Sequence, residues 1–434
     1  MNTLRMPHPR FRLYTSRSHY WPPLAGLFKS GDGDRETTGF EDEVCRRLGA
    51  EQAVCVPSAR IGIYLVVRAL VPAGKEVILS PLTIADVVAM VIAAGAIPVF
   101  ADVCHKDCHV DPVEVERLIG RNTGAVLITH LYGQTAGASR LKALCQAHNL
   151  PLIEDAAQAF GAREMGKALG TWGHAGVFSF GIFKHLTTWR GGMVVCSSAG
   201  LADEIRREVR GMKVMPRWRL SALIALGAIY DLATLPVLFS ALTYRVFRTA
   251  FLKDVDCLNR FVDPEASAQP VSSIPAGYLR RMTGWQARVG LAGLASVDAE
   301  NEIRRSKARM YREGLDGLED ELVLPAERPG AWSVFPYSPV QCAERTALLR
   351  WAFKCGRDIG THTLRNCAEL PAFRPYHREC PNAQEASRSL ILLPTYPRYP
   401  VSEVKRNIEV IRSFFGQRRR VGFTSRRMVG ADAS

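Results

Sequence analysis

Between residues 40 and 200 the sequence alternates short apolar runs with stretches of helical spacing, and this alternation limits the possible folds more than any other feature. The runs predict buried strands, and the stretches between them predict helices. The predicted strands lie within residues 76–81, 97–103, 123–133, 150–157, 176–181 and 191–198. The predicted helices lie within residues 84–95, 111–120 and 138–149. Such a pattern forms a mostly parallel sheet covered on both faces, and ligands bind these sheets at the carboxyl ends of the strands.

The chain has 434 residues, which is enough for one large α/β domain and a smaller second domain. Residues 283–318 have the length and spacing of a long helix leading out of the large domain, and residues 320–415 mix strand-like and helical pieces. We therefore predict a basic arm, a large domain with an apolar insertion, a linking helix with a small α+β domain, and a basic tail. The predicted boundaries are 1–38 for the arm, 39–282 for the large domain, 213–275 for the insertion, 283–415 for the small domain and 416–434 for the tail.

The net charge of +14 is concentrated near both ends of the chain and in residues 212–220. Solubilising tails and attraction to an anionic surface both explain it. We predict no nucleic-acid partner, because no zinc-finger spacing or RNA-binding aromatic motif accompanies the charge. The eleven cysteines lack CxxC spacing and the first residues lack an apolar signal core, so we expect a cytoplasmic protein with reduced thiols. We predict no metal site.

Residues 220–244 are unlike the rest of the chain, because their only charged residue is Asp231. The segment is long enough to span a bilayer, but Asp231 at its middle and Pro236 argue against a simple spanning helix. Basic residues flank it on both sides, so one interpretation is a hairpin of two short helices in the membrane interface, on the inner face of the membrane. The other interpretation is a buried helical pair or a dimer contact.

Lys184 is the only lysine in the run FSFGIFKHLTTWRGG, residues 178–192, which is otherwise largely apolar, aromatic or hydroxylic. A desolvated lysine amine has a lowered pKa, so it can be neutral and nucleophilic near neutral pH. Such an amine forms a Schiff base with an aldehyde, and pyridoxal phosphate (PLP) is the common aldehyde partner in proteins. Taken alone, a lysine in such a run is more often a surface residue whose stem lies on apolar side chains.

A PLP site also requires an acid for the ring nitrogen and donors for the phosphate. Asp155 and Gln158 follow a predicted strand, at the expected carboxyl edge of the sheet. Ser179 precedes Lys184 on another strand, and Ser58 stands at a strand-to-helix turn where free N–H groups and the helix dipole favour a phosphate. The Glu154-Asp155 pair and Ser58 could instead be ordinary helix caps.

Together these motifs are specific. The series HLYGQ, EDAAQAFGA, FSF with Lys184 following, and Gly191-Gly192 strongly resembles the DegT/DnrJ/EryC/StrS sugar aminotransferase family. The resemblance covers most of the chain, from GFEDEVCRRLGA to CPNAQEASRSLILLPTYP. It implies the aspartate aminotransferase fold, with a mostly parallel seven-stranded sheet and a small C-terminal α+β domain. It also implies a homodimer whose active site lies between two subunits.

By this resemblance, Lys184 would form the Schiff base and move the proton between substrate and cofactor. Asp155 would hold the ring nitrogen, and Gln158 would lie against the ring or its phenolic oxygen. Ser179 and Ser58 would bind the phosphate. Arg281 would contact substrate or phosphate, with a structural ion pair as the alternative.

Four departures from the family pattern fall at or beside the expected cofactor site. They are Ser58-Ala59-Arg60 in place of Ser-Gly-Thr, Ile84 in place of a stacking aromatic, His185 in place of asparagine, and Trp189-Arg190 in place of Gly-Glu. We expect Ala59 to be tolerated if its φ is negative, Arg60 to pair with the phosphate, and Ile84 to cover the ring as an apolar lid. These changes predict a divergent member of the family.

The resemblance therefore predicts a PLP-dependent aminotransferase. It would move an amino group from an amino acid, glutamate by analogy, to a keto-sugar linked to a nucleotide or a lipid. The alternatives are a non-catalytic PLP-binding regulatory protein and a membrane-associated scaffold that has lost the cofactor.

Overall fold

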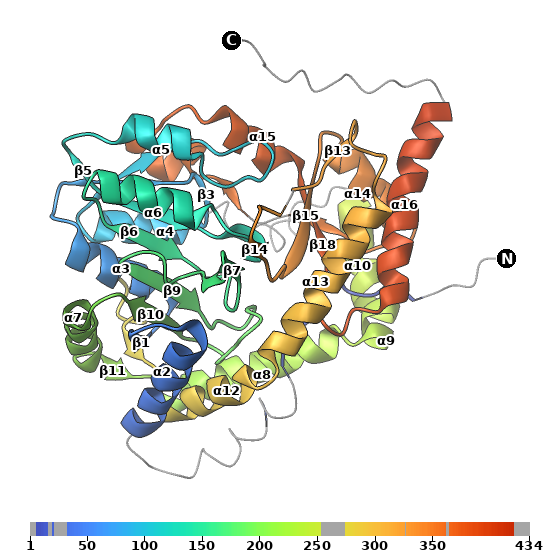
Figure 1. Cartoon of the computed structure of the whole chain (residues 1–434). Helices are drawn as coiled ribbons and strands as arrows, with labels where there is room; N and C mark the ends of the chain where they lie inside the picture. Colours follow the sequence, from blue (N-terminus) through green and yellow to red (C-terminus); the bar gives the residue numbers. More distant parts are fainter. Residues whose placement is uncertain are drawn as a thin grey trace.

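The computed structural model describes residues 6–15, 20, 33–252, 274–325, 327–361 and 364–420. Much of the predicted basic arm, residues 253–273 of the apolar insertion and residues 421–434 of the tail lie outside the described residues. Within the described part, a large α/β domain and a smaller C-terminal domain lie side by side (Figure 1).

A seven-stranded sheet forms the centre of the large domain, with strand order β1-β10-β9-β6-β5-β2-β4. All neighbouring pairs are parallel except those that involve β10, which runs antiparallel to β1 and β9. The mostly parallel sheet predicted from the alternating pattern is confirmed. Its strands are β1 (Gln52–Val56), β2 (Glu76–Leu79), β4 (Ile97–Phe100), β5 (Thr123–Thr129), β6 (Leu152–Asp155), β9 (Ala175–Ser179) and β10 (Gly192–Cys196).

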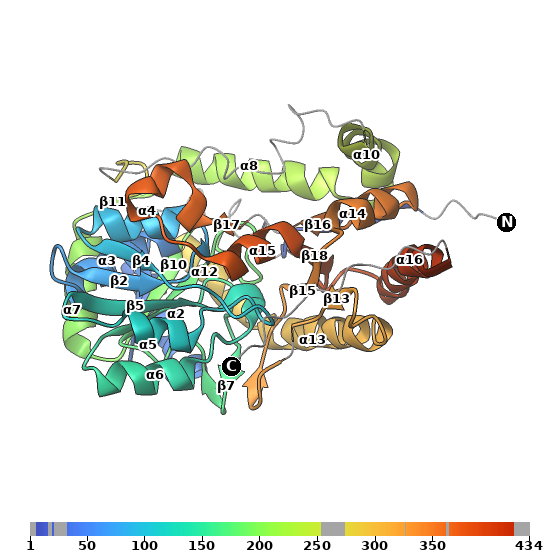
Figure 2. The ribbon, with the colours of Figure 1, turned by 90° about the horizontal axis from the view of Figure 1, so that it is seen from above.

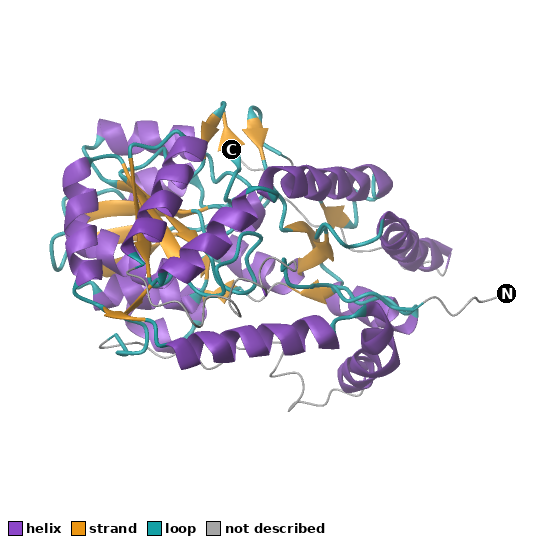
Figure 3. Cartoon of the chain, turned by 90° about the horizontal axis from the view of Figure 1, so that it is seen from below, coloured by secondary structure: helices purple, strands orange, loops and turns teal. Residues whose placement is uncertain are grey.

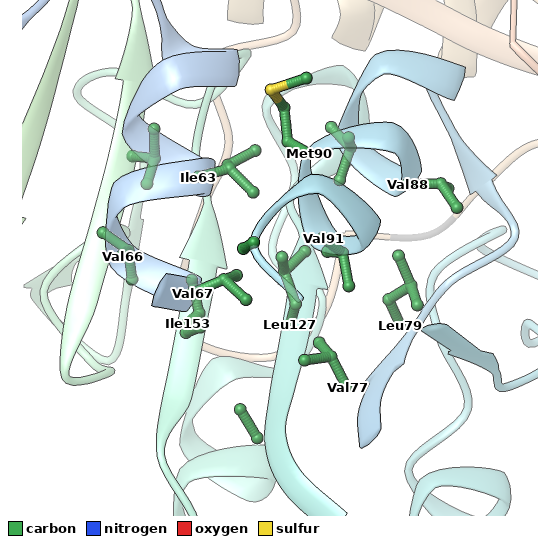
Figure 4. Close-up of a cluster of buried hydrophobic side chains, with 14 of the residues drawn as sticks. Ile63, Val66, Val67, Val77, Leu79, Val88, Met90, Val91, Leu127 and Ile153 are labelled. Carbon is green, nitrogen blue, oxygen red and sulfur yellow. The ribbon is translucent and has the colours of Figure 1, made fainter. Parts of the chain in front are cut away.

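Helices cover both faces of this sheet, as two separate apolar cores show. Figure 4 shows the core beneath α3 and α4, where helix residues such as Val67 and Val91 meet Leu127 of β5 and Ile153 of β6. Polar residues at the N-terminal ends start several of the helices; Asp111, for example, accepts a hydrogen bond from the Val113 N–H at the start of α5. The helices of the large domain are α2 (Asp34–Leu48), α3 (Ala59–Leu70), α4 (Ala85–Ala93), α5 (Pro112–Leu118), α6 (Ala138–Ala147), α7 (Ala199–Arg210) and α12 (Gly284–Leu294).

The predicted long helix over residues 283–318 is wrong in one respect, because the structure has two helices there. Helix α12 ends at Leu294, and α13 (Val297–Gly314) begins after a break at Ala295 and Ser296. Helix α13 leads to an antiparallel four-stranded sheet in the order β13-β15-β18-β16, against which α14 and α16 also pack. The remaining elements of this domain are β13 (Leu322–Val323), β15 (Tyr337–Cys342), α14 (Arg345–Lys354), β16 (Gly360–Thr361), α15 (Pro381–Ser389), β18 (Leu390–Pro394) and α16 (Val401–Arg420). Helix α16 continues past the predicted tail boundary at residue 416.

The apolar segment forms helix α8 (Arg217–Ala233) followed by a bend and a second helical stretch. This stretch consists of α9 (Pro236–Leu238), the π-helical turn η2 (Phe239–Thr243) and α10 (Tyr244–Leu252). Figures 2 and 3 show α8 lying along one side of the molecule, from the large domain towards α10 and the small domain. Tyr244 and Phe239 pack on Phe353 of α14, and the Tyr244 hydroxyl donates to the Phe353 carbonyl at 2.9 Å.

Candidate active site

The strand register brings the predicted site residues to one edge of the sheet. Gly192 pairs with Val56 of β1 on one side and with Ser179 of β9 on the other. The turn that begins at Ser58, two residues past the end of β1, therefore lies close to Ser179. On the other side of β9, Asp155 pairs with Val177. This edge holds the carboxyl ends of β1, β6 and β9, as expected from the sequence.

Gly192 also explains why the turn after β1 can approach the sheet so closely. A Cβ atom at this position would lie 2.7 Å from the Ala59 backbone nitrogen and 2.7 Å from the Phe178 carbonyl oxygen. Only glycine at position 192 lets the Ser58–Ala59 turn pack directly against β10. The Gly191-Gly192 motif therefore determines how close this turn lies to the sheet.

Lys184 lies in a short loop after β9, where its backbone N–H donates to the Gly181 carbonyl at 3.0 Å. Its amine makes no hydrogen bond to any of the described residues. Burial lowers the pKa of the Lys184 amine, and the charge of Asp155 partly offsets that effect. Burial raises the pKa of the Asp155 carboxyl group, and the charge of Lys184 partly offsets that effect in turn, so the amine and the carboxylate are close enough to act on each other.

Asp155 is buried at the end of β6, and burial raises the pKa of its carboxyl group. Its Oδ1 accepts a hydrogen bond from the Ala157 N–H at 3.1 Å. Oδ2 accepts none from the described residues. A buried carboxylate with a free oxygen is costly unless a cation or an N–H group meets it. The arrangement therefore fits a protonated ring nitrogen.

Glu154, directly before Asp155, points to the opposite side of β6 and is fully bonded there. Its oxygens accept hydrogen bonds from the N–H groups of Gly170 and Gly173, both at 2.7 Å, and lie 2.9 Å from His130 Nε2. Because His130 Nδ1 accepts the Ala136 N–H, Nε2 carries the proton and donates it to Glu154. The two acids of the EDAAQ motif thus have separate roles: Glu154 fastens loops and Asp155 faces the site. His130, for which the sequence predicted no role, also influences the pKa of Asp155.

Gln158 is half-buried, and its Oε1 accepts the Tyr132 N–H at 3.0 Å. Tyr132 has a positive φ of 55°, an unfavourable conformation for a large side chain. The bond to Gln158 holds that turn in place. This contact joins the HLYGQ and EDAAQ motifs, which the sequence showed only as separate signals.

The Ser58-Ala59-Arg60 turn begins helix α3. The Ser58 side chain accepts the Ile61 N–H as an N-terminal cap, and Ala59 is the first helical residue and is not among the described residues with positive φ. Alanine is therefore compatible with this turn. Arg60 forms an ion pair with Asp86 at 2.7 Å and stacks over the ring of Tyr278 at 4.8 Å. Its guanidinium is thus partly neutralised, which the sequence did not indicate.

Three other predicted residues occupy different surroundings. Ile84 is partly exposed at the start of α4, two residues before Asp86. His185 is buried, with Nε2 3.0 Å from the Phe160 carbonyl oxygen, so it is directed into its own subunit. Arg281 forms an ion pair with the exposed Asp34 at 2.8 Å, the structural alternative considered from the sequence.

Trp189 and Arg190, which replace the usual Gly-Glu of the family motif, contact α8 and the residues before β12 (Arg280–Arg281). Trp189 is fully buried with φ of 69°, and its ring packs against Gly227 of α8, where a Cβ atom would lie 2.1 Å from the ring. Arg190 donates to the Gly277 carbonyl at 3.2 Å and lies over the Tyr278 ring. Burial and the nearby Arg60 lower the pKa of Arg190.

A second lysine, Lys307 in α13, is also largely buried, so it must be compared with Lys184 as the residue that could react with an aldehyde. Burial lowers the pKa of Lys307 to about 8. Its amine, however, donates to the carbonyls of Tyr396 and Pro397, both at 2.8 Å. A lysine held by two carbonyl groups is a structural donor, so it is not placed to react with an aldehyde. Elsewhere in the described part of the chain, no group of three or more His, Cys, Asp or Glu residues is arranged to hold a metal ion.

The fold and the site together define a class, an α/β enzyme in which a half-buried lysine and a buried carboxylate lie close enough to influence each other's charge, at the carboxyl edge of a seven-stranded sheet. Solved structures of this class are similar over nearly the whole chain. DesV from S. venezuelae, solved in complex with a ketimine intermediate, has a TM-score of 0.73 at 27% identity and covers 92% of this chain and 94% of its own. Helicobacter pylori PseC, an aminotransferase involved in pseudoaminic acid biosynthesis, shows the same fold with a TM-score of 0.72 at 17% identity, covering 95% of this chain and 99% of its own.

The sequence comparisons give the family. The pattern of the DegT/DnrJ/EryC1/StrS aminotransferase family matches residues 26–234 and 250–412, and the chain belongs to this family. Among curated relatives, GDP-perosamine synthase of Vibrio cholerae is 37% identical over 391 residues, which cover 87% of this chain and 90% of the relative. The enzyme is therefore a PLP-dependent aminotransferase of the aspartate aminotransferase fold, as the sequence motifs predicted.

Proposed function

We propose that this enzyme transfers an amino group from an amino acid, glutamate by analogy, to a keto-sugar that is linked to a nucleotide, with PLP held by Lys184 and Asp155. The observation that carries the proposal is the pairing of these two groups. An amine without a hydrogen-bond partner among the described residues lies within electrostatic reach of a carboxylate that has one oxygen without a partner among those residues, and the two lie at the carboxyl edge of the sheet. A protein that had lost the cofactor would have no need for either feature.

PLP, when bound, supplies an aldehyde for amino-group transfer and a pyridinium ring that accepts electrons from the substrate carbon. In this chain the free Oδ2 of Asp155 would hold the ring nitrogen in its protonated form. The Ala157 N–H on Oδ1 fixes the orientation of that carboxylate. Ser179 and the helix start at Ser58 would hold the phosphate, because helix N-termini present free N–H groups to anions.

Lys184 Nζ would move the substrate proton. Burial lowers the pKa of this amine and so favours its uncharged form, which is the form that can accept a proton. The negative charge of Asp155 acts in the opposite direction, because it raises the pKa of the amine and so favours the charged form. The amine could therefore also return the proton to the substrate. The Gly181 carbonyl, which accepts the Lys184 backbone N–H, holds the loop that carries this side chain.

Two further features complete the proposed site. Arg60 and Arg190 stack on Tyr278 beside the Ser58 turn and add positive charge that would favour an anionic ligand there. Ile84 begins α4 two residues before Asp86, the ion-pair partner of Arg60, and would serve as an apolar cover for the ring. We also propose that the enzyme is a homodimer, by analogy with the family.

The keto-sugar acceptor rests on two relatives, one named for a nucleotide-linked sugar and the other for polysaccharide biosynthesis. GDP-perosamine synthase of Vibrio cholerae and the Bacillus subtilis spore coat polysaccharide biosynthesis protein SpsC both match this chain, the second at 38% identity over 168 residues, 38% of this chain and 43% of the relative. A scaffold that has lost the cofactor is not favoured, because the chain keeps the lysine and the acid, and a non-catalytic binding protein is not favoured, because the chain belongs to a family of aminotransferases.

The test separates the two halves of the reaction. Purified enzyme loaded with PLP should convert glutamate to 2-oxoglutarate in an amount equal to the enzyme present, and Lys184→Ala should not. A nucleotide-linked keto-sugar should then be converted to its amino sugar, detected by mass spectrometry, while the same sugar without its nucleotide should react poorly. PLP binding without any response to glutamate would refute the proposal in favour of a binding protein.

A further inference from the structure

Helix α8 and the helical stretch that follows it expose an unusual number of large apolar side chains. Helices that are apolar on all sides are normally covered on all sides, and a large exposed apolar surface marks an interaction site. The exposed residues of this segment are Trp218, Leu226, Ile229, Tyr230, Leu232, Leu235, Val237, Leu238, Leu242 and Val246. We define these residues as the outer face.

The two sides of α8 have different surroundings. The side facing the protein carries Leu220, Ile224 and Gly227, at helical spacing, and packs against Trp189 and its neighbours. The opposite side carries Trp218, Ala222, Ala225, Ile229 and Leu232 at the same spacing, and all five are exposed. Burying the inner side therefore leaves a second apolar stripe without a partner in the described part of the chain.

Asp231, the only charge between residues 220 and 244, is on the inner side. Its Oδ2 accepts hydrogen bonds from the hydroxyls of Thr15 and Tyr20, the latter at 2.6 Å. A carboxylate in contact with lipid would oppose membrane binding, but Asp231 points away from the outer face. The residues that make up the outer face carry no charge.

We propose that the outer face docks on a membrane surface that contains anionic lipids. The charges around the outer face support a membrane with anionic lipids. Lys213 and Arg217 are exposed at one end of the segment, and Arg245 is exposed at the other. No acidic residue other than Asp231 lies between residues 212 and 253. Apolar residues with basic flanks are the pattern of helices that lie in the interface of an anionic membrane. A second copy of the chain would oppose these cations with identical ones, and like charges repel.

The helices would lie along the surface rather than cross it. In the described residues no single helix is long and apolar enough to span a bilayer, and the pair Arg217–Ala233 and Pro236–Val246 is bent by 64°. Helix α8 is about 25 Å long, shorter than the hydrocarbon core of a bilayer, and its inner side is fixed to the protein. Trp218, beneath the guanidinium of Arg219 at 5.2 Å, is a side chain suited to the boundary between headgroups and hydrocarbon.

Part of the outer face is an addition to the family pattern. Residues 235–249 are not matched by that pattern, and they include Leu235, Val237, Leu242 and Val246. Tyr230 of the outer face is only partly exposed, and its ring also packs against that of Phe183, with 5.3 Å between the ring centroids, one residue from Lys184. Docking would therefore place the loop that carries Lys184 next to the membrane.

The test is sedimentation of the full-length, PLP-loaded enzyme with phosphatidylcholine vesicles, with and without about one third phosphatidylglycerol. The enzyme should sediment with the anionic vesicles. Its affinity should fall more than about a hundredfold in the double variant Ile229→Glu/Leu242→Glu, because two exposed apolar side chains no longer enter the interface. Removing basic charge with Lys213→Gln or Arg245→Gln should weaken binding about fivefold each. The matched control, Val113→Glu, changes an exposed apolar residue on α5 and should bind as the wild type does.

Far-UV circular dichroism and the glutamate half-reaction should be unchanged in the double variant, since both side chains are exposed. Wild-type enzyme that stays in solution with both kinds of vesicle would overturn the proposal. Equal binding by the double variant would also overturn it and would assign binding to basic residues elsewhere. If the double variant instead converts a larger oligomer to a smaller one, while the wild type ignores vesicles, the face belongs to a second copy of the chain.

Discussion

Replacing Trp189 by glycine, the residue usual in the family motif, should loosen α8 from the active-site loop. Trp189 is 1% exposed, and its indole ring fills the space left by the missing side chain of Gly227. Truncating a buried tryptophan to alanine costs about 3–5 kcal/mol of unfolding free energy. Glycine relieves the positive φ of 69°, which costs a non-glycine residue about 1–2 kcal/mol. The net loss of stability should therefore be about 1–4 kcal/mol.

A double-mutant cycle tests whether the contact itself is responsible. Gly227→Leu alone should also destabilise the protein, because its Cβ would lie 2.1 Å from the Trp189 ring. The combined variant Trp189→Gly/Gly227→Leu should recover part of the loss, since leucine partly refills the space. We expect a coupling energy above about 1 kcal/mol from urea unfolding followed by circular dichroism.

Limited proteolysis provides a second measurement. Trp189→Gly should be cleaved faster within residues 217–233, because α8 loses its main anchor on the large domain. Unfolding free energies that simply add, together with unchanged cleavage of α8, would refute the packing argument.

Three more substitutions test the roles of individual buried groups. Asp155→Asn should slow the glutamate half-reaction about a hundredfold or more while leaving the urea midpoint nearly unchanged, because asparagine can still accept the Ala157 N–H. Glu154→Gln should lower the unfolding free energy by about 2 kcal/mol or more, because one amide oxygen cannot replace the carboxylate that meets Gly170, Gly173 and His130. Equal stability of Asp155→Asn and Glu154→Gln would contradict the different roles assigned to the two acids. His185→Asn should reduce the loss of stability between pH 7 and pH 5. Burial lowers the pKa of His185 to about 3, so below the ordinary pKa of about 6.5 the unfolded chain binds a proton that the folded chain does not, and stability falls by up to about 2 kcal/mol at pH 5. Identical urea midpoint shifts in the wild type and the variant would contradict this.

The sequence predicted the sheet and its carboxyl edge because both depend on local patterns. Apolar runs bounded by turn residues locate the strands, and the position of Asp155 at the end of one strand and of Lys184 beyond another then follows from parallel pairing. The sequence could predict that these two residues lie close together, because they follow neighbouring strands of one sheet.

The remaining features depend on contacts between distant parts of the chain. Arg60 was expected to meet a phosphate, but Asp86 and Tyr278 determine where its guanidinium lies. The burial of Trp189 depends on Gly227, in a segment that the sequence identified only as apolar. No local pattern carries such information, because a side chain reaches its partner only after the elements have packed.

The most direct test of the central claim is to trap the bond between enzyme and cofactor. Enzyme incubated with PLP is reduced with borohydride, which makes a Schiff base permanent, and is then digested for peptide mapping by mass spectrometry. The structure predicts the cofactor on Lys184 and none on Lys307, whose amine is held by two carbonyl groups. A modified Lys307 with an unmodified Lys184, or no modified lysine at all, would contradict the account.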